Sequence, residues 1–535
     1  MPASKPVTPD EEFDYVIVGA GSSGSALAAA LARSSQATIA VIEAGVRRWP
    51  KITAIPAALL TTIGHHKYDW RYVSEPDPTR FGRTEAWPRG LGPGGSGLIN
   101  GMIFVRGAPD DYDQWSQLGA DGWAYRDVLP HFRRFESTDI GSEQSRGGLG
   151  PQTISALRYV HPMTTTFIEG AVTAGLEFNP DYNGSRQDGV SYVQATQSGG
   201  RRHSPYDAYL APAIKSGRIR LIEGAHVKHV LFEGRTATGV LLEQGGGERT
   251  IRARRLVVLS AGSLNTPKLL MLSGIGKAAT LKAHGITPLV ESPEVGANLM
   301  EHAGIWLRAE VDRPTFNQEG RSVRRMVNVV RALMGQGPGT SPTAQAVGFV
   351  RTKAGLAAPD VQIHFTAFGR EALDPKLPDR RLISVVPSVN HPLSRGEVTL
   401  ASGDYRDAPL IHPRLFAEQE DVETLKRGLA KCLEILGSEP LASHVVRIEN
   451  PPPEDPEDLD RHIRESAGPI YHPVGTCRMG SDEQAVLTPA LHVRGTQRLA
   501  VCDASIMPRH VSGNTHAASM MIGDRAADLF LKNVQ

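Results

Sequence analysis

Three glycines near the N-terminus have the spacing of a nucleotide-binding turn. Gly19, Gly21 and Gly24 form G-x-G-x-x-G directly after a short apolar run, and Glu43 follows at the end of the next apolar run. In such a unit the glycines permit a tight turn, a close approach of the backbone to a pyrophosphate, and close packing of the following helix. The pyrophosphate accepts hydrogen bonds from the start of that helix, and the acidic residue binds ribose hydroxyls. The chemistry indicated is dinucleotide binding, for which NAD and FAD are both suitable.

Two histidines near the C-terminus are candidates for a general base. The unperturbed pKa of histidine lies near 6.5, so the side chain can accept a proton at neutral pH. His472 stands between an aromatic residue and a proline in a glycine-bearing loop, and His516 follows Ser512 and Asn514, which are candidate N-caps of a helix. Residue type alone does not select these two, because most of the 18 histidines are expected to be structural or on the surface.

The glycine turn requires a strand, a helix and a second strand around it. The apolar pattern predicts a buried parallel strand at Tyr15–Val18, a helix at Ser23–Arg33 and another buried strand at Thr38–Ile42. A further buried strand at Arg255–Ser260 runs into Gly262, which precedes a helix. This second junction between a strand and a helix is typical of the same kind of domain.

The middle of the chain has a different pattern. Between residues 306 and 444, longer predicted strands such as Leu382–Val386 and Gly396–Leu400 are mixed with helices such as Val422–Leu436. This mixture predicts a separate α+β lobe. The proline-rich segment Asn450–Pro456 prevents either flanking element from continuing, and we expect it to return the chain to the first domain.

Length and composition point to a multi-domain protein with small-molecule ligands. The chain has 535 residues, which at roughly 150 residues per domain indicates two to four lobes. Its net charge of +1 gives no reason to expect nucleic acid as a partner. The three cysteines, Cys432, Cys477 and Cys502, have no metal-site spacing and are an odd number, so we expect no metal and no disulfide framework, and a reducing compartment is favoured.

The N-terminal segment has no apolar core of a signal peptide, and no uncharged apolar stretch is long enough to span a bilayer. A cytoplasmic protein is therefore expected. The segment Arg321–Met334 can form a basic amphipathic helix with Val323, Met326, Val327, Val330 and Met334 along one side. Such a helix is typical of peripheral membrane contact, although packing on its own domain is the favoured interpretation.

Six later stretches occur in a characteristic order after the N-terminal GAGSSG and Glu43. They are GGSGLINGMIFVRG (94–107), GSLNTPKLLMLSGIG (262–276), VGANLMEH (295–302), YHPVGTCRMG (471–480), CDASIMP (502–508) and GNTHAASMMIGDRAADLF (513–530). Over nearly the whole chain this set resembles the glucose-methanol-choline (GMC) oxidoreductases. Within that family it looks most like the bacterial branch of choline, sorbose and polyethylene-glycol dehydrogenases.

The resemblance implies a fold of two domains. The first is an α/β Rossmann-like FAD-binding domain that is discontinuous in sequence, formed by residues 1–160, 190–305 and 460–535. The second is an α+β substrate-binding domain built on an antiparallel sheet, formed by residues 161–189 and 306–459. The implied cofactor is FAD, and the implied substrate is an alcohol.

The resemblance also implies roles for individual residues. In alcohol oxidation the flavin takes a hydride at N5 and the protein takes the hydroxyl proton. His472 falls on the position of the general base and His516 on the position of its partner, whereas His65, His66, His226 and His302 are expected to be structural. The expected cofactor-binding residues are Gly19, Gly21, Ser22, Ser23, Gly24, Glu43, Ala44, Gly94, Gly95, Ser96, Asn100, Gly101, Met102, Ile103, Val227, Ala261, Gly262, Asp503, Ala504, Asn514 and Thr515.

Three positions depart from the family pattern. Leu91 and Pro93 stand where a basic and an aliphatic residue are usual, and Glu301 stands where aspartate is common. Some members carry a histidine in the glycine-rich segment that attaches covalently to the flavin, whereas residues 98–100 here are Leu, Ile and Asn. We therefore expect FAD to bind non-covalently.

The function expected from these observations is an FAD-dependent alcohol dehydrogenase. It would oxidise a neutral, primary alcohol to the aldehyde with His472 as base and pass the electrons to a quinone or another carrier. An oxidase of the same fold that reduces O2 to hydrogen peroxide is the main alternative, and a non-redox hydroxynitrile lyase is a third. No aromatic cage for a quaternary ammonium is recognisable in the sequence, which argues against choline. The particular alcohol, the electron acceptor and the oligomeric state are left open.

Overall fold

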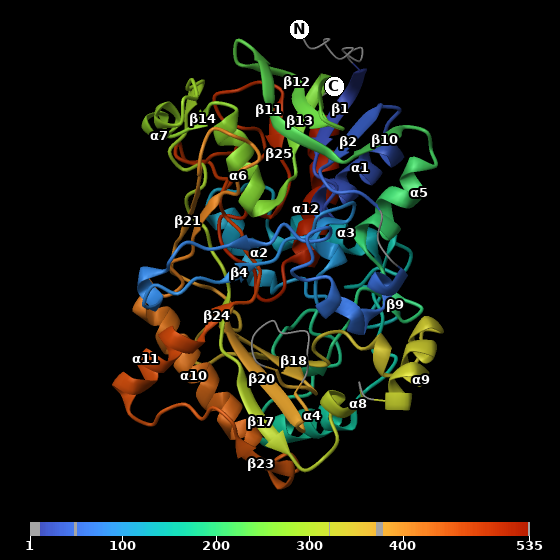
Figure 1. Cartoon of the computed structure of the whole chain (residues 1–535), viewed down its shortest axis with the longest axis vertical. Coiled ribbons are helices and arrows are strands. Elements are labelled where there is room, and N and C mark those ends of the chain that lie inside the picture. Colours follow the sequence, from blue (N-terminus) through green and yellow to red (C-terminus); the bar gives the residue numbers. More distant parts are fainter. Residues whose placement is uncertain (1–10, 48–50, 320–321, 371–377, 533–535) are drawn as a thin grey trace.

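The computed structural model of the protein describes residues 11–47, 51–319, 322–370 and 378–532. Figure 1 shows two lobes stacked along the long axis of the molecule. One lobe contains the start and the end of the described chain and a mixed sheet, and the other is built on an antiparallel sheet. This α/β lobe beside an antiparallel lobe is the fold class that the sequence predicts.

The mixed sheet has the strand order β10-β2-β1-β13-β12-β11, and β25 pairs with β13. The pairs from β10 to β13, and the pair of β13 with β25, are parallel, whereas β11, β12 and β13 form an antiparallel meander. The strands are β1 (Glu11–Val18), β2 (Ile39–Glu43), β10 (Ile219–Glu223), β11 (Ala225–Glu233), β12 (Thr236–Gln244), β13 (Gly247–Leu259) and β25 (Leu499–Val501). The carboxyl ends of β1, β2, β13 and β25 therefore lie at one edge, where Gly19, Glu43, Ser260 and Cys502 follow or end them.

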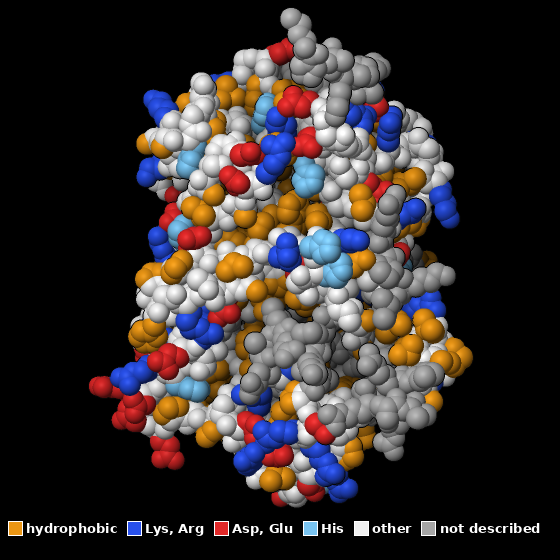
Figure 2. Space-filling model, in the orientation of Figure 1, with side chains coloured by type: hydrophobic (Ala, Val, Ile, Leu, Met, Phe, Trp, Pro, Cys, Tyr) orange, Lys and Arg blue, Asp and Glu red, His pale blue; other side chains and the backbone are white. Residues whose placement is uncertain are grey.

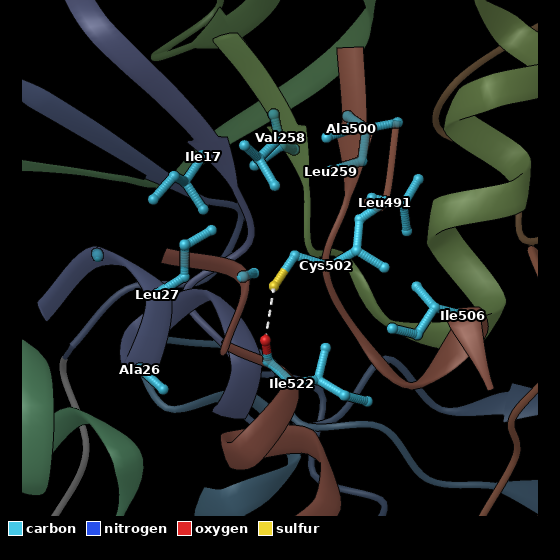
Figure 3. Close-up of a cluster of buried hydrophobic side chains, with 14 of the residues drawn as sticks. Ile17, Ala26, Leu27, Val258, Leu259, Leu491, Ala500, Cys502, Ile506 and Ile522 are labelled. Atoms are coloured by element: carbon cyan, nitrogen blue, oxygen red, sulfur yellow. Dashed lines mark hydrogen bonds between the residues drawn. The ribbon is translucent and has the colours of Figure 1, made fainter. Parts of the chain in front are cut away.

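Two helices that are distant in sequence pack against each other beside this edge. They are α1 (Ser22–Ser34) and α12 (His516–Lys532). A Cβ added to Gly523 of α12 would lie 2.3 Å from the carbonyl oxygen of Ser23, so the two backbones are in direct contact. Figure 3 shows the apolar core beside this contact, where the Cys502 thiol points to the Ile522 carbonyl oxygen at 3.8 Å and Leu27 lies nearby on α1. The packing places the start of α12 next to the glycine turn.

The second sheet is antiparallel, with the order β23-β17-β20-β19-β18-β7, and β16 pairs with both β20 and β24. Its core is closed by α4 (Pro162–Thr173) and α10 (Gln419–Leu436), for example where Phe167 stacks on Phe365 with ring centroids 4.4 Å apart. The strands are β7 (Gly189–Tyr192), β16 (Ala303–Gly304), β17 (Leu307–Val311), β18 (Ala346–Val350), β19 (Val361–Thr366), β20 (Leu382–Val389), β23 (Val445–Ile448) and β24 (Gly468–Pro469).

Strand membership in this sheet shifts the expected domain limits by a few residues. The division expected between residues 189 and 190 falls inside β7, which pairs with β18 along its whole length. Strands β16 and β24 also belong to the antiparallel sheet, although the sequence places both in the first domain. These two short strands pair where the chain passes between the lobes.

Further elements surround the two sheets. The remaining helices are α2 (Pro109–Gln117), α3 (Tyr125–Phe135), α5 (Ala211–Ile214), α6 (Gly262–Leu272), α7 (Ala278–Ala283), α8 (Phe316–Glu319), α9 (Ser322–Leu333) and α11 (Pro456–Ser466). Short paired strands are β3 (Tyr72–Val73), β4 (Ala86–Trp87), β5 (Glu136–Ser137), β6 (Gln152–Thr153), β8 (Gln197–Ser198), β9 (Arg201–Arg202), β14 (Ile275–Gly276), β15 (Val290–Glu291), β21 (Glu397–Thr399) and β22 (Leu410–His412). All three cysteines are buried and unpaired. Among the helices of the described ranges, none has the length and apolar character needed to cross a bilayer.

Candidate active site

A cavity of about 430 Å³ is lined by residues of both lobes. It extends from Val227 on β11, past the glycine turn, to His364 and Val386 on the antiparallel sheet. All the site residues expected from the sequence line this cavity except Gly24 and Gly94, which pack directly behind its wall. Gly24 packs α1 on the turn, since a Cβ there would lie 2.1 Å from the Gly19 carbonyl oxygen, and the Gly94 N–H donates to the Ala20 carbonyl at 2.7 Å.

The glycine turn has the geometry of an anion-binding cradle. Gly19 has a φ of +107°, a left-handed conformation that glycine adopts without strain. A Cβ on Gly21 would meet no atom within 4 Å, so this glycine faces open space in the cavity. Gly21 is also the N-cap of α1 and has no side chain to accept hydrogen bonds from the first N–H groups of the helix. An anion such as a pyrophosphate can supply those acceptors.

Glu43 connects three loops around the turn. Its carboxylate accepts hydrogen bonds from the backbone N–H groups of Ala20 at 3.1 Å, Gly45 at 2.9 Å and Gly92 at 3.1 Å. Burial raises the pKa of this carboxyl group, and the three N–H donors act against that shift. A carboxylate has about four acceptor positions, so Glu43 can hold the loops and still accept from a ribose hydroxyl.

The glycine-rich segment after β4 forms a second wall, and a buried arginine holds it in place. Arg202 donates to the Gly97 carbonyl at 3.2 Å and to the Asn100 Oδ1 atom at 2.7 Å, and that same oxygen accepts from the Met102 N–H at 3.1 Å. Burial lowers the pKa of Arg202 to about 9. Met102 has a φ of +61°. No motif in the sequence marks Arg202, because its contacts are with residues about 100 positions earlier.

Asp503 joins the end of β25 to the start of α6. Its Oδ2 atom accepts from the Gly262 N–H at 2.9 Å and from the Thr266 hydroxyl at 2.5 Å, and its Oδ1 atom accepts from the Ser505 N–H at 2.8 Å. Asp503, Ala504 and Ala261 line the cavity beside the glycine turn. The carboxylate therefore fixes one wall of the cavity at the edge of the mixed sheet.

His472 is held by its backbone as well as its side chain. It follows β24 by three residues, and the residue before it, Tyr471, has a φ of +72°. Glu301 accepts a hydrogen bond from the His472 N–H at 2.6 Å. Burial raises the pKa of Glu301 to about 8, and the charge of Arg89 opposes that shift. A left-handed conformation is strained for a tyrosine, so the contact with Glu301 stabilises a loop path that the chain would not adopt alone.

A second histidine determines which nitrogen of His472 carries the proton. The Nε2 atom of His302 lies 2.8 Å from the Asn390 carbonyl oxygen, which can only accept, so Nε2 is the protonated nitrogen. Burial, assisted by neighbouring histidines, lowers the pKa of His302 well below its ordinary value, so the ring is neutral and its Nδ1 atom is an acceptor. That atom lies 3.1 Å from the Nδ1 atom of His472, which must therefore donate.

His472 consequently presents an unprotonated Nε2 atom. Burial is the main cause that lowers its pKa well below the ordinary value, and electrostatic interactions with His510, His364 and Arg89 add to it, so a single proton is present and it lies on Nδ1. The Nε2 atom lies 3.0 Å from the amide nitrogen of Asn514 and next to the cavity. The Asn514 amide therefore donates a hydrogen bond to this basic nitrogen, and both groups stand at the cavity wall.

The side chain that faces His472 is Asn514, whereas His516 was the expected partner. Gln362 donates to the Asn514 Oδ1 atom at 3.2 Å, which turns the amide nitrogen toward His472. The Nδ1 atom of His516 instead lies 2.9 Å from the Ser22 hydroxyl, and burial lowers the pKa of His516 to about 4. His516 is the first residue of α12, so it faces the neighbouring α1, while Asn514 lies in the loop before the helix.

Comparison with known proteins places this site in a family. The N-terminal family model described as GMC oxidoreductase matches residues 13–304, and the C-terminal one matches residues 392–523. The chain belongs to the GMC oxidoreductase family. Like other members it is an FAD-dependent oxidoreductase that acts on CH–OH groups, and the glycine cradle, Glu43 and the open space at Gly21 fit that cofactor.

Relatives in the GMC family cover nearly the whole chain. An oxygen-dependent choline dehydrogenase of Brucella suis biovar 1 is 37% identical over 527 residues, which are 97% of this chain and 96% of the relative. Among solved structures, pyridoxine 4-oxidase from Mesorbium loti has a TM-score of 0.87 at 29% identity and covers 96% of this chain and 98% of its own. A formate oxidase of Aspergillus oryzae has a TM-score of 0.91 at 26% identity, and the match covers 98% of this chain and 99% of the oxidase chain.

The hydrogen bond between the two histidines gives a testable prediction. In a His302→Leu variant the Nδ1–H of His472 loses its acceptor, and we expect turnover to fall about 10- to 100-fold, the cost of one buried hydrogen bond. In His302→Gln an amide oxygen can replace the acceptor, so activity should recover in part. Flavin content should match that of a His284→Phe control, which lies outside the cavity. Full turnover by the leucine variant would contradict the assigned role.

Proposed function

We propose that this enzyme oxidises a neutral, primary alcohol to the aldehyde, with His472 as the general base. The observation that carries the proposal is the unprotonated Nε2 atom of His472 beside the Asn514 amide in the cavity. The bound flavin supplies the acceptor for the hydride that leaves the alcohol carbon. The protein must bind the alcohol, remove its hydroxyl proton and exclude water.

Two side chains are proposed to interact with the substrate oxygen. The Asn514 amide donates to it and orients the hydroxyl, and the Nε2 atom of His472 accepts the hydroxyl proton. A positioned base of this kind typically contributes about 10²- to 10⁴-fold to the rate. The proton on Nδ1 stays in the hydrogen bond to His302, so His472 does not need to change tautomer before it accepts the second proton.

The cofactor is proposed to lie along the cavity from β11 to His472. The backbone of Val227 would meet the adenine, Glu43 the ribose, and the turn from Gly19 to Ser23 the pyrophosphate. Asp503, Ala504 and the segment from Ser96 to Ile103 would flank the flavin. We propose non-covalent binding, because Ile99 lines the cavity where some relatives in the family carry the histidine that attaches to the flavin.

The substrate end of the cavity combines aromatic and apolar side chains with a few polar ones. Trp306, Phe368, Tyr471 and Val386 line it on the side of the antiparallel sheet, together with Arg370, Thr366 and Ser384. Such a wall suits a neutral alcohol with an apolar or aromatic body. Aromatic faces also attract quaternary ammonium groups, and the 37% identity to choline dehydrogenases favours choline as the second candidate substrate.

The electron acceptor is proposed to be a quinone or another carrier, with O2 as the alternative. The structural neighbours named as oxidases support the alternative. Both reactions share the same first half, in which the alcohol reduces the flavin. They differ in whether hydrogen peroxide accompanies the aldehyde in equal amounts, so the ratio of the two products distinguishes them.

Removing the base tests the proposal directly. We expect His472→Ala to lower the rate of alcohol oxidation by about 10²- to 10⁴-fold with FAD still bound, because the positioned base is lost. Asn514→Ala should lower it less, by about tenfold or more, through loss of one hydrogen bond to the substrate oxygen. A His284→Ala control should be unaffected. If the His472 variant kept the rate of the native enzyme at full flavin content, the assignment would fail.

Two matched glycine substitutions test the pyrophosphate cradle, and acid precipitation tests the non-covalent attachment of the flavin. Gly21 and Gly148 both have open space where a Cβ would stand, and neither requires a left-handed conformation. Gly21→Val should purify with little flavin, because its side chain fills the cradle, whereas Gly148→Val should retain it. Acid precipitation of the native protein should leave the flavin in the supernatant. Yellow colour in the washed precipitate would instead show a covalent bond.

A further inference from the structure

Helix α9 carries a concentration of exposed apolar side chains. Val327, Val329, Val330, Leu333 and Met334 are each 43% to 61% exposed, within eight consecutive residues. At helical spacing, residues 327, 330 and 334 form one row and residues 329 and 333 the next, so they cover one broad face. Figure 2 shows apolar side chains gathered over α9 at the lower right of the molecule. An exposed apolar patch of this kind usually marks an interaction site.

The C-terminal end of the helix is anchored to the protein, so the exposed face points toward solvent. Ala332 is buried, and a Cβ added to Gly339 would lie 2.4 Å from its own Cβ, so the helix is tightly packed there. The Leu333 carbonyl accepts from Arg201 at 2.5 Å, and the Gly335 carbonyl accepts from Arg158 at 3.0 Å. The sequence favours packing of the apolar side on its own domain, but the structure leaves Val327, Val330 and Met334 of that side exposed. The side chains of Val323 and Met326 lie outside the described ones.

The charge of residues 321–334 indicates which kind of partner binds the exposed face of α9. Residues 321–334 include four arginines and no acidic residue, and Arg331 is exposed on the described part of the helix. Arg331 and the two arginines that bond the end of the helix, Arg201 and Arg158, are all exposed beside this face. Apolar side chains next to such cations match the surface of an anionic bilayer, where the apolar face enters the headgroup region and the cations meet lipid phosphates. In a symmetric dimer through this face the same arginines would be brought toward one another, which disfavours a second copy as the occupant.

The helix is connected to a wall of the cavity. The short helix η6 (Pro338–Thr340) packs on α9 and on η2 (Pro56–Thr61). Leu59 of η2, and Thr343 and Ala344 directly after η6, line the cavity. A membrane bound at α9 would therefore lie close to the elements that form this wall.

We propose that α9 is a peripheral membrane-docking surface for anionic lipid. Its apolar face inserts at the boundary of headgroups and acyl chains, and Arg331, Arg201 and Arg158 contact the headgroups. The docking depends on the surface of the folded protein and not on the reaction proposed above.

Vesicle flotation of the FAD-loaded enzyme tests the proposal. The probes are vesicles of equal parts phosphatidylglycerol and phosphatidylcholine, compared with phosphatidylcholine alone. The native enzyme should float with the anionic vesicles, and a Val327→Ser, Val330→Ser, Leu333→Ser variant should lose at least tenfold in partition coefficient. The control is Val172→Ser with Val446→Ser, which changes exposed valines elsewhere and should leave flotation unchanged. Arg331→Gln should lower the partition coefficient about fivefold at low salt.

Three results would overturn the proposal. The native enzyme could fail to float with anionic vesicles, or the triple-serine variant could float as well as the native enzyme. Light scattering in the absence of lipid could also show a dimer that the triple-serine variant converts to a monomer, which would assign the face to contact between copies. Flavin content and circular dichroism of the variants verify that each is folded, so a loss of flotation can be attributed to the face itself.

Discussion

The hydrogen bond between the Nδ1 atoms of His302 and His472 is the interaction on which the rest of the site depends. Two neutral imidazoles form such a hydrogen bond in one defined direction only if the surroundings determine which of their other nitrogens carries a proton. The Asn390 carbonyl fixes His302, and this leaves the Nε2 atom of His472 as a free base facing Asn514. Burial keeps both rings neutral, because a charged ring would lose more solvation than its neighbours restore.

The antiparallel sheet explains why these residues meet. His302 directly precedes β16, and His472 follows β24, and the two strands pair with Ala303 opposite Pro469. On its other side β16 pairs with β20 through Gly304 and Ser388, which brings Asn390 to the same place. The antiparallel sheet therefore aligns the groups proposed to transfer the proton, while the mixed sheet and its glycine turn form the wall proposed to hold the cofactor. Alcohol oxidation needs both at once, which accounts for a cavity lined by the two lobes.

The sequence predicts local features well and long-range contacts poorly. The unit around Gly19 and Glu43 could be read directly, since its strands, glycines and helix are consecutive, and α1 and α10 begin within three residues of the expected positions. The roles of His302 and Arg202 could not be read from the sequence, because each depends on contacts with residues more than 85 positions away. Asn514 and His516 are two residues apart, and only the start of α12 between them decides which one faces His472. The exposed face of α9 depends equally on which side of the helix the fold leaves uncovered.

The most direct test of the account is the visible spectrum of the purified enzyme before and after anaerobic addition of alcohols. The panel should include aliphatic, aromatic and heteroaromatic methanols, glycols, sugar alcohols and choline. The account predicts a flavin spectrum that a neutral, primary alcohol bleaches, and readmission of air then distinguishes an oxidase from a dehydrogenase. A protein that purifies without flavin under any condition, or a bound flavin that no member of the panel reduces, would contradict it.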